Sequence, residues 1–207
     1  MKLIKGCILV IVVLAVTAGC APKRVPEEKG ESIPLSQVLM QTLKRYEGIN
    51  TLQTQVSVKL DMGGDLYLLR GLFLYENPAS LRLRLAASLG PTVGEVIYTD
   101  GLLAILVPSK GKIYQGWIGE GEHPALETIL LTVVYADYAE MEGRGFPTRI
   151  YGEGEGLGVR FDVKLKNPQV DIALTEGAFT PPTEGWEVHP LEELKDLLQG
   201  VEVGKGP

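Results

Sequence analysis

Short apolar segments separated by turn residues fill the stretch from Leu66 to Trp117. This pattern predicts five strands in succession. The breaks between them are turn-forming sequences, namely Asn77-Pro78, Leu89-Gly90-Pro91, Asp100-Gly101 and Pro108-Ser109-Lys110-Gly111. Connections this short join only antiparallel neighbours, because a parallel crossover needs about a dozen residues or more. We therefore predict an antiparallel meander.

The faces of these strands differ in polarity. Between Ser80 and Ala86, leucines alternate with arginines, which predicts one dry face and one wet face. A further strand with a period of two is predicted over residues 52–62. In residues 66–76 and 102–107 both faces are apolar, so we expect either a second covering layer or a central place in a strongly curved sheet. We predict a curved sheet with an apolar concave side.

Three helices are expected around this sheet. Ser36 can cap a helix over residues 37–46, whose apolar residues recur at helical spacing and which Gly48 would end. A second helix, expected over residues 123–135, has one apolar stripe and would cover the sheet as a lid. A third, over residues 191–199, is amphipathic.

The second half of the chain is expected to complete the sheet. An acidic loop is predicted over residues 136–145, followed by strands at residues 149–151 and 159–166 on either side of a glycine-rich turn. Residues 170–174 and the region of Phe179 are expected to form the last strands. The predicted fold class is mainly β with helices (α+β), as one domain over residues 36–200 with a frayed tail at 201–207.

Residues 1–19 have the features of a secretory signal peptide. Lys2 and Lys5 precede an apolar run, and the segment closes on Thr17-Ala18-Gly19-Cys20. This closing sequence resembles the bacterial lipobox, which implies a diacylglycerol thioether on the Cys20 sulfur and cleavage before that residue. The alternative is an uncleaved membrane anchor, but the apolar run is shorter than the roughly 18 residues that a span needs. Residues 20–35 are then an acylated N-terminus and a flexible tether.

Charge and cysteine content narrow the possible functions. The chain has a net charge of −6 and a pI near 5.1, which argues against nucleic acid as a partner. With Cys7 removed in the signal peptide and Cys20 acylated, no thiol remains for a disulfide, a metal or a nucleophile. His123 and His189 each lie beside a proline in a turn-like setting, with no nucleophile motif nearby. We expect no enzyme activity, no metal and no cofactor.

Several segments occur in the order and spacing of a known family. They are Tyr46-Glu47-Gly48-Ile49 at the end of the first helix, Tyr75-Glu76-Asn77-Pro78, the arginine-leucine strand at residues 81–85, the turn Thr99-Asp100-Gly101, Phe179-Thr180-Pro181-Pro182 and Trp186-Glu187-Val188. Over residues 36–188 the chain therefore resembles the LolA/LolB-like lipoprotein-carrier superfamily. The resemblance implies a half-open antiparallel barrel with a helical lid, whose concave side holds acyl chains.

Because the chain has its own lipobox, it is most similar to the lipid-anchored, LolB-like members. These imply an acceptor that takes lipoproteins from a soluble periplasmic carrier and inserts them into the outer membrane. The residue after Cys20 is Ala21 and not aspartate, so outer-membrane attachment is expected if the host is Gram-negative. The segment Ser88-Leu89-Gly90-Pro91 resembles the apolar loop of those members, which makes Leu89, Gly90 and Pro91 the expected membrane-contact loop.

A barrel-like sheet of this size can enclose one small apolar ligand lined by branched aliphatic side chains. The residues expected to line such a cavity are Val56, Val58, Leu60, Leu72, Leu74, Leu81, Leu83, Leu85 and Ile105. The expected ligands are lipid acyl chains or lipoproteins. The same side chains can also pack into a closed core, which would suit a structural or envelope-sensing lipoprotein.

Overall fold

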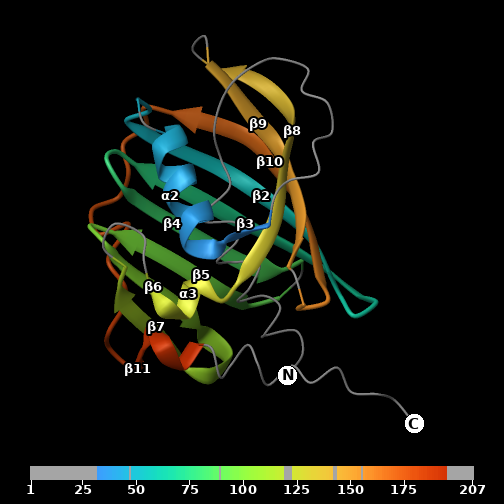
Figure 1. The fold of residues 1–207 in the computed structure, drawn as a ribbon. Helices are drawn as coiled ribbons and strands as arrows, with labels where there is room; N and C mark the ends of the chain where they lie inside the picture. Colours follow the sequence, from blue (N-terminus) through green and yellow to red (C-terminus); the bar gives the residue numbers. More distant parts are fainter. Residues whose placement is uncertain are drawn as a thin grey trace.

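The computed structural model describes residues 32–46, 48–88, 90–118, 123–141, 144–154 and 156–194. These residues form one large open sheet of eleven strands in the order β1-β8-β9-β10-β2-β3-β4-β5-β6-β7-β11 (Figure 1). Neighbouring strands are antiparallel throughout this part of the chain, except that β11 is parallel to β7. The mainly β fold expected from the sequence is confirmed at this level.

The strands are β1 (Ser32–Pro34), β2 (Thr51–Met62), β3 (Asp65–Glu76), β4 (Ser80–Ala87), β5 (Thr92–Thr99), β6 (Leu102–Val107), β7 (Lys112–Trp117), β8 (Leu130–Met141), β9 (Arg144–Gly154), β10 (Val159–Val170) and β11 (Glu187–Pro190). The helical elements of the described residues are the α-helices α2 (Leu35–Tyr46) and α3 (Pro124–Glu127) and the 3₁₀ turns η1 (Pro108–Lys110) and η2 (Leu191–Glu193). Within the described ranges, none of the helices has the length and apolar character needed to cross a bilayer.

The predicted meander is confirmed as the run β3-β4-β5-β6-β7, with β2 and β10 beside it. Its tight turns have the backbone geometry that their residues favour. Gly63 and Gly64 have φ values of 60° and 92° between β2 and β3, and Asp100 and Gly101 have φ values of 48° and 88° between β5 and β6. Left-handed residues at both central positions match the twist of a two-residue hairpin.

The first predicted helix is present as α2, but its cap is not the one expected. The helix begins at Leu35, so Ser36 lies inside its first turn and donates its hydroxyl hydrogen to Glu127. The amide of Leu35 donates to the carbonyl of Ile129 at 2.9 Å. A backbone carbonyl from the connection between α3 and β8 thus satisfies the first of the helical N–H groups that lack an intrahelical partner. β1 also brings residues 32–34, which the sequence assigned to the tether, into the sheet.

The predicted lid helix over residues 123–135 is wrong. Only α3 is helical there, and the chain continues as β8, which with β9 also replaces the acidic loop expected at residues 136–145. The run Thr132-Val133-Val134-Tyr135 is β-branched and aromatic, which favours a strand once partners exist on both sides. Those partners are β1 and β9.

The strands expected at residues 170–174 and near Phe179 are also absent from the described chain. β10 ends at Val170, and residues 171–186 then cross the sheet without strand pairing until β11 begins. Pro181 and Pro182 have no N–H to donate to a ladder, which disfavours a strand here. The third predicted helix is described only as far as Leu194, as η2 and one further residue, and the remainder lies outside the described residues.

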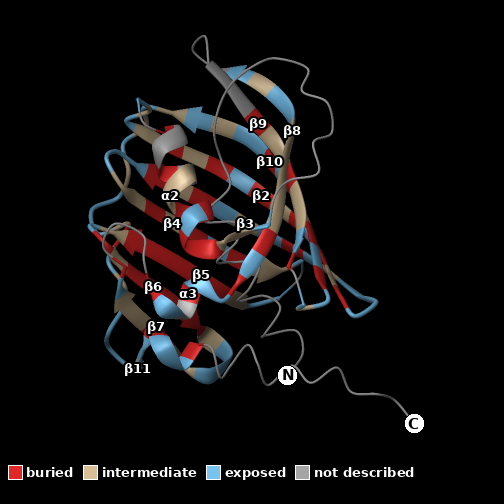
Figure 2. Ribbon diagram, viewed as in Figure 1, coloured by how far each residue is buried: buried red, intermediate tan, exposed pale blue. Residues whose placement is uncertain are grey.

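The two faces of the sheet are covered differently. We call the face that carries α2 the inner face and the opposite one the outer face (Figure 1). Along β2, every even-numbered residue from Leu52 to Met62 is buried, as the alternating colours of Figure 2 show. The period of two places all of them on one face, which is the inner one. A smaller cluster on the outer face consists of Ile97, Ala104, Leu106, Ile113 and Phe179. The covering layer expected for residues 102–107 is therefore the segment that contains Phe179.

A substitution at Gly71 tests how closely β3 and β4 approach each other. A Cβ atom at this position would lie 2.0 Å from the carbonyl oxygen of Arg84 and 2.7 Å from Cδ2 of Leu85. We expect Gly71→Ala to lower the free energy of unfolding by about 1–3 kcal/mol, because the strands would have to separate. Urea unfolding measures this, with Ser57→Ala on the neighbouring strand as a control that should change stability by less than about 0.5 kcal/mol. An unchanged midpoint for Gly71→Ala would contradict this packing.

Candidate functional site

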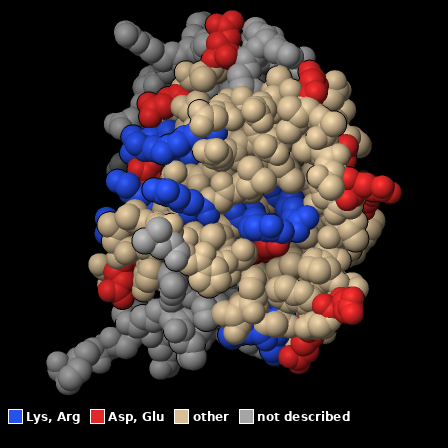
Figure 3. All heavy atoms as spheres, turned by 180° about the vertical axis from the view of Figure 1, so that it is seen from behind, with Lys and Arg blue, Asp and Glu red and all other residues tan. Residues whose placement is uncertain are grey.

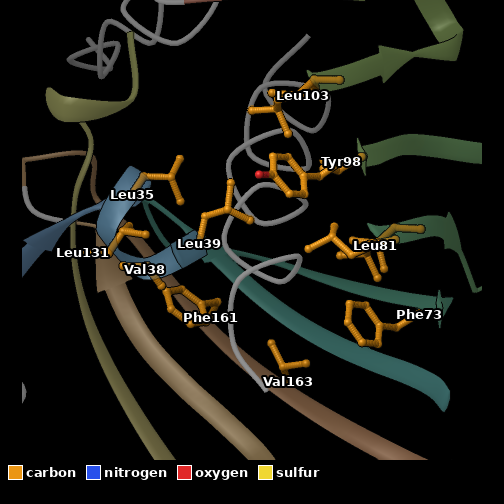
Figure 4. Close-up of a cluster of buried hydrophobic side chains, with 14 of the residues drawn as sticks. Leu35, Val38, Leu39, Phe73, Leu81, Tyr98, Leu103, Leu131, Phe161 and Val163 are labelled. Atoms are coloured by element: carbon orange, nitrogen blue, oxygen red, sulfur yellow. The ribbon is translucent and has the colours of Figure 1, made fainter. Parts of the chain in front are cut away.

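The inner face is a continuous apolar surface built by strand register. One row across it contains Phe73, Leu83, Val96, Ile105 and Tyr114, each opposite the next in the pairing of β3 through β7. Further rows come from β2 and β10, and all of these side chains belong to one cluster with those of α2. Figure 4 shows side chains from the strands and from α2 pointing into the same interior.

Seven of the nine predicted cavity residues lie on this face. They are Val56, Val58 and Leu60 of β2, Leu81, Leu83 and Leu85 of β4, and Ile105 of β6, and each is buried. The structure adds aromatic and aliphatic residues that the sequence did not single out, namely Phe73, Tyr98, Leu103, Phe161, Val163 and Leu165. The alternation of Val159–Leu165 with charged residues was the signal that could have found the β10 members.

Leu72 and Leu74 do not lie with the other seven. In register, Leu72 is opposite Gln55 and Arg84, and Leu74 is opposite Gln53 and Arg82, so both point to the outer face. Leu72 remains 37% exposed. Both faces of β3 are apolar, so the sequence of this strand alone could not decide which leucines point inward.

The inner face is larger than the area of α2, which packs on it together with Leu126 of α3 and Leu191 of η2. α2 has 12 residues, which corresponds to a length of about 18 Å and a width of about 10–12 Å with side chains. The five strands from β10 to β5 span about 24 Å at ~4.8 Å per strand and extend for roughly 27–40 Å. By these dimensions α2 covers about a quarter of the area that these strands present.

α2 is fixed at both ends. Its first amide bonds to Ile129, and Ser36 bonds to Glu127 of α3. At its other end, the ring of Tyr46 packs on Tyr75 and Phe73, with centroid separations of 4.8 and 5.7 Å. The helix is therefore held at both termini, in addition to the packing of Val38, Leu39 and Leu43 on the inner cluster.

The inner face has little acid–base chemistry to offer. Tyr98 is an ionisable residue on its strands, and burial raises the pKa of its phenol. The nearby charge of Asp100 raises that pKa further, whereas a backbone hydrogen bond at Gly101 lowers it. The phenol is therefore neutral at ordinary pH. In the described part of the chain, no group of three or more His, Cys, Asp or Glu residues could hold a metal ion.

The predicted membrane-contact loop is described only in part. Leu89 and the predicted lipidation site Cys20 lie outside the described residues. Gly90 and Pro91 are exposed, and the amide of Gly90 donates to the carbonyl of Ala87 at 3.1 Å. Ser88 donates to the carbonyl of Leu68 at 3.1 Å, which places the loop beside the first half of β3. There Leu66 and Leu68 are 64% and 53% exposed.

Substitution of two leucines, one on each face, tests which side chains of β3 and β4 point to the inner face. We expect Leu83→Ala to cost about 2–5 kcal/mol of folding free energy, because a buried side chain leaves a cavity in the inner cluster. Leu72→Ala removes the same atoms from a half-exposed site, where surface substitutions usually cost less than about 1 kcal/mol. Thermal or urea unfolding distinguishes the two. Equal losses would contradict the assignment of faces.

No family model matches this chain, and no curated protein matches it. Similar solved structures include a LolA superfamily protein from Nitrosomonas europaea, with a TM-score of 0.49 and 11% identity over 65% of this chain and 91% of that chain. A DUF1329 family protein from Desulfovibrio piger has a TM-score of 0.47 and 7% identity over 70% of this chain and 95% of that chain. An uncharacterized conserved protein from Thermus thermophilus has a TM-score of 0.46 and 12% identity, covering 75% and 99%. Similarities at this level do not assign the chain to a family.

Proposed function

We propose that this protein binds the acyl chains of lipids or lipoproteins against the inner face of its sheet. The observation that carries the proposal is the excess of apolar inner surface over the area of α2. An acyl chain suits such a surface because it consists of methylenes, which need no hydrogen-bond partners. Each methylene removed from water contributes about 0.8 kcal/mol to the binding free energy. In this proposal α2 and α3 act as the lid, and the curved sheet acts as a half-barrel around the ligand.

The finer role rests on the sequence. The lipobox ending in Cys20 would anchor the domain to a membrane, and the resemblance to the lipoprotein carriers supports the transfer of lipoproteins as the task. We propose that the protein is a non-enzymatic acceptor at the outer membrane, which receives lipoproteins from a soluble periplasmic carrier and inserts them. The exposed loop at Gly90 and Pro91, together with Leu66 and Leu68, offers an apolar tip for contact with the bilayer.

One observation favours a second candidate function. The seven predicted cavity residues on the inner face are all nearly inaccessible to solvent, with exposed fractions of 0–2%. This burial favours a closed core, and with it a structural or envelope-sensing lipoprotein on the same scaffold. The two candidates differ in whether a lipid accompanies the protein.

Native mass spectrometry separates them. We expect the Cys20→Ser variant, which cannot be acylated at that position, to be purified with a bound lipid, because the inner face has more apolar surface than its own helices cover. Delipidated protein to which phospholipid is added back serves as the reference mass. If every charge state corresponds to the bare polypeptide, and added lipid does not bind, the closed-core function is the correct one.

The role of the loop is tested by Leu89→Glu. We expect this variant to fold normally and to deliver lipoprotein to vesicles roughly tenfold more slowly, since a charged side chain loses the insertion energy of a leucine, which is about 1.5–3 kcal/mol when fully buried. Val188→Glu, at an exposed position on β11, is the matched control and should transfer at the wild-type rate. Wild-type delivery by Leu89→Glu would remove the loop from the mechanism.

A further inference from the structure

Residues 171–186, which we call the outer strap, run across the outer face from the end of β10 to the start of β11. At its first end, the amide of Asp171 donates to the carbonyl of Thr51 at 2.9 Å, and the hydroxyl of Thr51 donates to the carbonyl of Ile172 at 2.7 Å. Further along, Phe179 is buried in the outer cluster. The strap is therefore held at Asp171–Ile172 and again at Phe179, and the residues between form an arch.

A cavity of about 220 Å³ lies under this arch. Its floor comes from three adjacent strands, as Gln53 of β2, Leu72 and Leu74 of β3, and Arg82 and Arg84 of β4. Its roof is the strap itself, through residues 173–175 and Ala178. These are the two leucines that point away from the inner face. They form an apolar floor beside two arginines, in a place separate from the inner cluster.

The two arginines of this cavity differ in the groups to which they donate hydrogen bonds. The Nε atoms of Arg82 and Arg84 both donate to the same carboxylate oxygen of Glu95, which for Arg84 lies at 3.3 Å. Nη1 of Arg82 also donates to the carbonyl of Ala178 in the strap, at 2.6 Å. Two guanidinium groups thus share one carboxylate, which leaves one net positive charge. Figure 3 shows Lys and Arg side chains gathered across the middle of this face.

The hydrogen-bond donors that are open to a ligand belong to Arg84. Its side chain is 53% exposed, whereas those of Arg82 and Glu95 are 17% and 7% exposed. Among the described residues, Arg84 donates only through Nε, so both of its terminal nitrogens remain available. A guanidinium presents its terminal and Nε hydrogens as a planar fork that matches an oxyanion.

We propose that the cavity beneath the outer strap binds an aliphatic monocarboxylate, with the carboxylate on Arg84 and the hydrocarbon on Leu72 and Leu74. The single net charge suits a monoanion better than a doubly charged phosphate. The apolar floor and the aliphatic strap residues Leu174 and Ala178 suit a hydrocarbon body. The cavity volume of about 220 Å³ limits the enclosed part to a short chain.

Methyl NMR of the full chain, titrated with sodium octanoate, tests this site. We expect saturable shifts at the methyls of Leu72, Leu74 and Leu174. Octanol, which has the same chain length without the charge, and inorganic phosphate, which has charge without the chain, should both bind more weakly. Shifts at Leu81 and Leu83 would report binding to the inner face, so the proposed function and this site succeed or fail separately.

Two variants sharpen the test. Arg84→Met leaves Arg82 and Glu95 as a neutral pair and should raise the octanoate dissociation constant by about tenfold or more, as expected for a lost hydrogen bond to a charged group. Arg160→Met removes the same charge from an outer-face arginine that pairs with Asp61 outside the cavity, and it should bind as the wild type does. Leu72→Asn keeps the charges and should also weaken binding.

The absence of saturable shifts at Leu72, Leu74 and Leu174 would overturn the proposal. Equal affinity for octanol and octanoate, or equal affinity in Arg84→Met and Arg160→Met, would do the same. Tighter binding of inorganic phosphate than of octanoate would assign the site to another class of anion and would also overturn it.

Discussion

On the inner face of the sheet, a row of apolar side chains from each of β10, β2, β3, β4, β5 and β6 must be kept from water. The 12 residues of α2 cover only part of this surface, and Leu126 of α3, Leu131 of β8 and Leu191 of η2 pack on the same cluster. Strand pairing fixes this surface, because a period of two sends every second side chain to the same side over long, regular ladders such as β2 with β3. In Figure 1 the edge of the sheet that contains β8 and β9 curls toward α2, so the sheet itself contributes to the cover of this face. The proposed acyl ligand would bind on the same face.

The outer face also has apolar side chains that must be covered, and there the cover is the outer strap, an extended segment, in place of a helix. Phe179 closes the apolar patch over Ile97, Ala104, Leu106 and Ile113, and the strap leaves a cavity where the floor changes from aliphatic side chains to arginines. Because Arg82 and Arg84 alternate with Leu81, Leu83 and Leu85 on β4, one strand supplies both the apolar inner face and the cationic outer face. The two faces therefore offer different chemistry, and a ligand on one need not compete with a ligand on the other.

Much of the sheet could be predicted from the sequence, where pattern and turn residues agree. The alternation in β2, β4 and β10, and the turns at Gly63-Gly64 and Asp100-Gly101, specify local structure without help from distant residues. The prediction of secondary structure failed where the same residues fit both the helical period of 3.6 and the strand period of 2. Leu126, Ile129, Leu130 and Val133 are spaced as on a helix, yet the chain from Leu130 onward is a strand paired with β1 and β9. Leu72 and Leu74 were assigned to the wrong face because β3 is apolar on both sides, and the arginines opposite them become visible only in the register.

The central claim is that the inner face holds a hydrocarbon chain from another molecule. The most direct measurement is paramagnetic broadening of methyl signals by stearate that carries a nitroxide near its terminal methyl group. If the inner face binds the chain, broadening is expected at Leu60, Leu83 and Val163, which are buried there. Sharp signals throughout the inner cluster, at stearate concentrations that broaden exposed leucines, would show that the core is closed and would contradict the account.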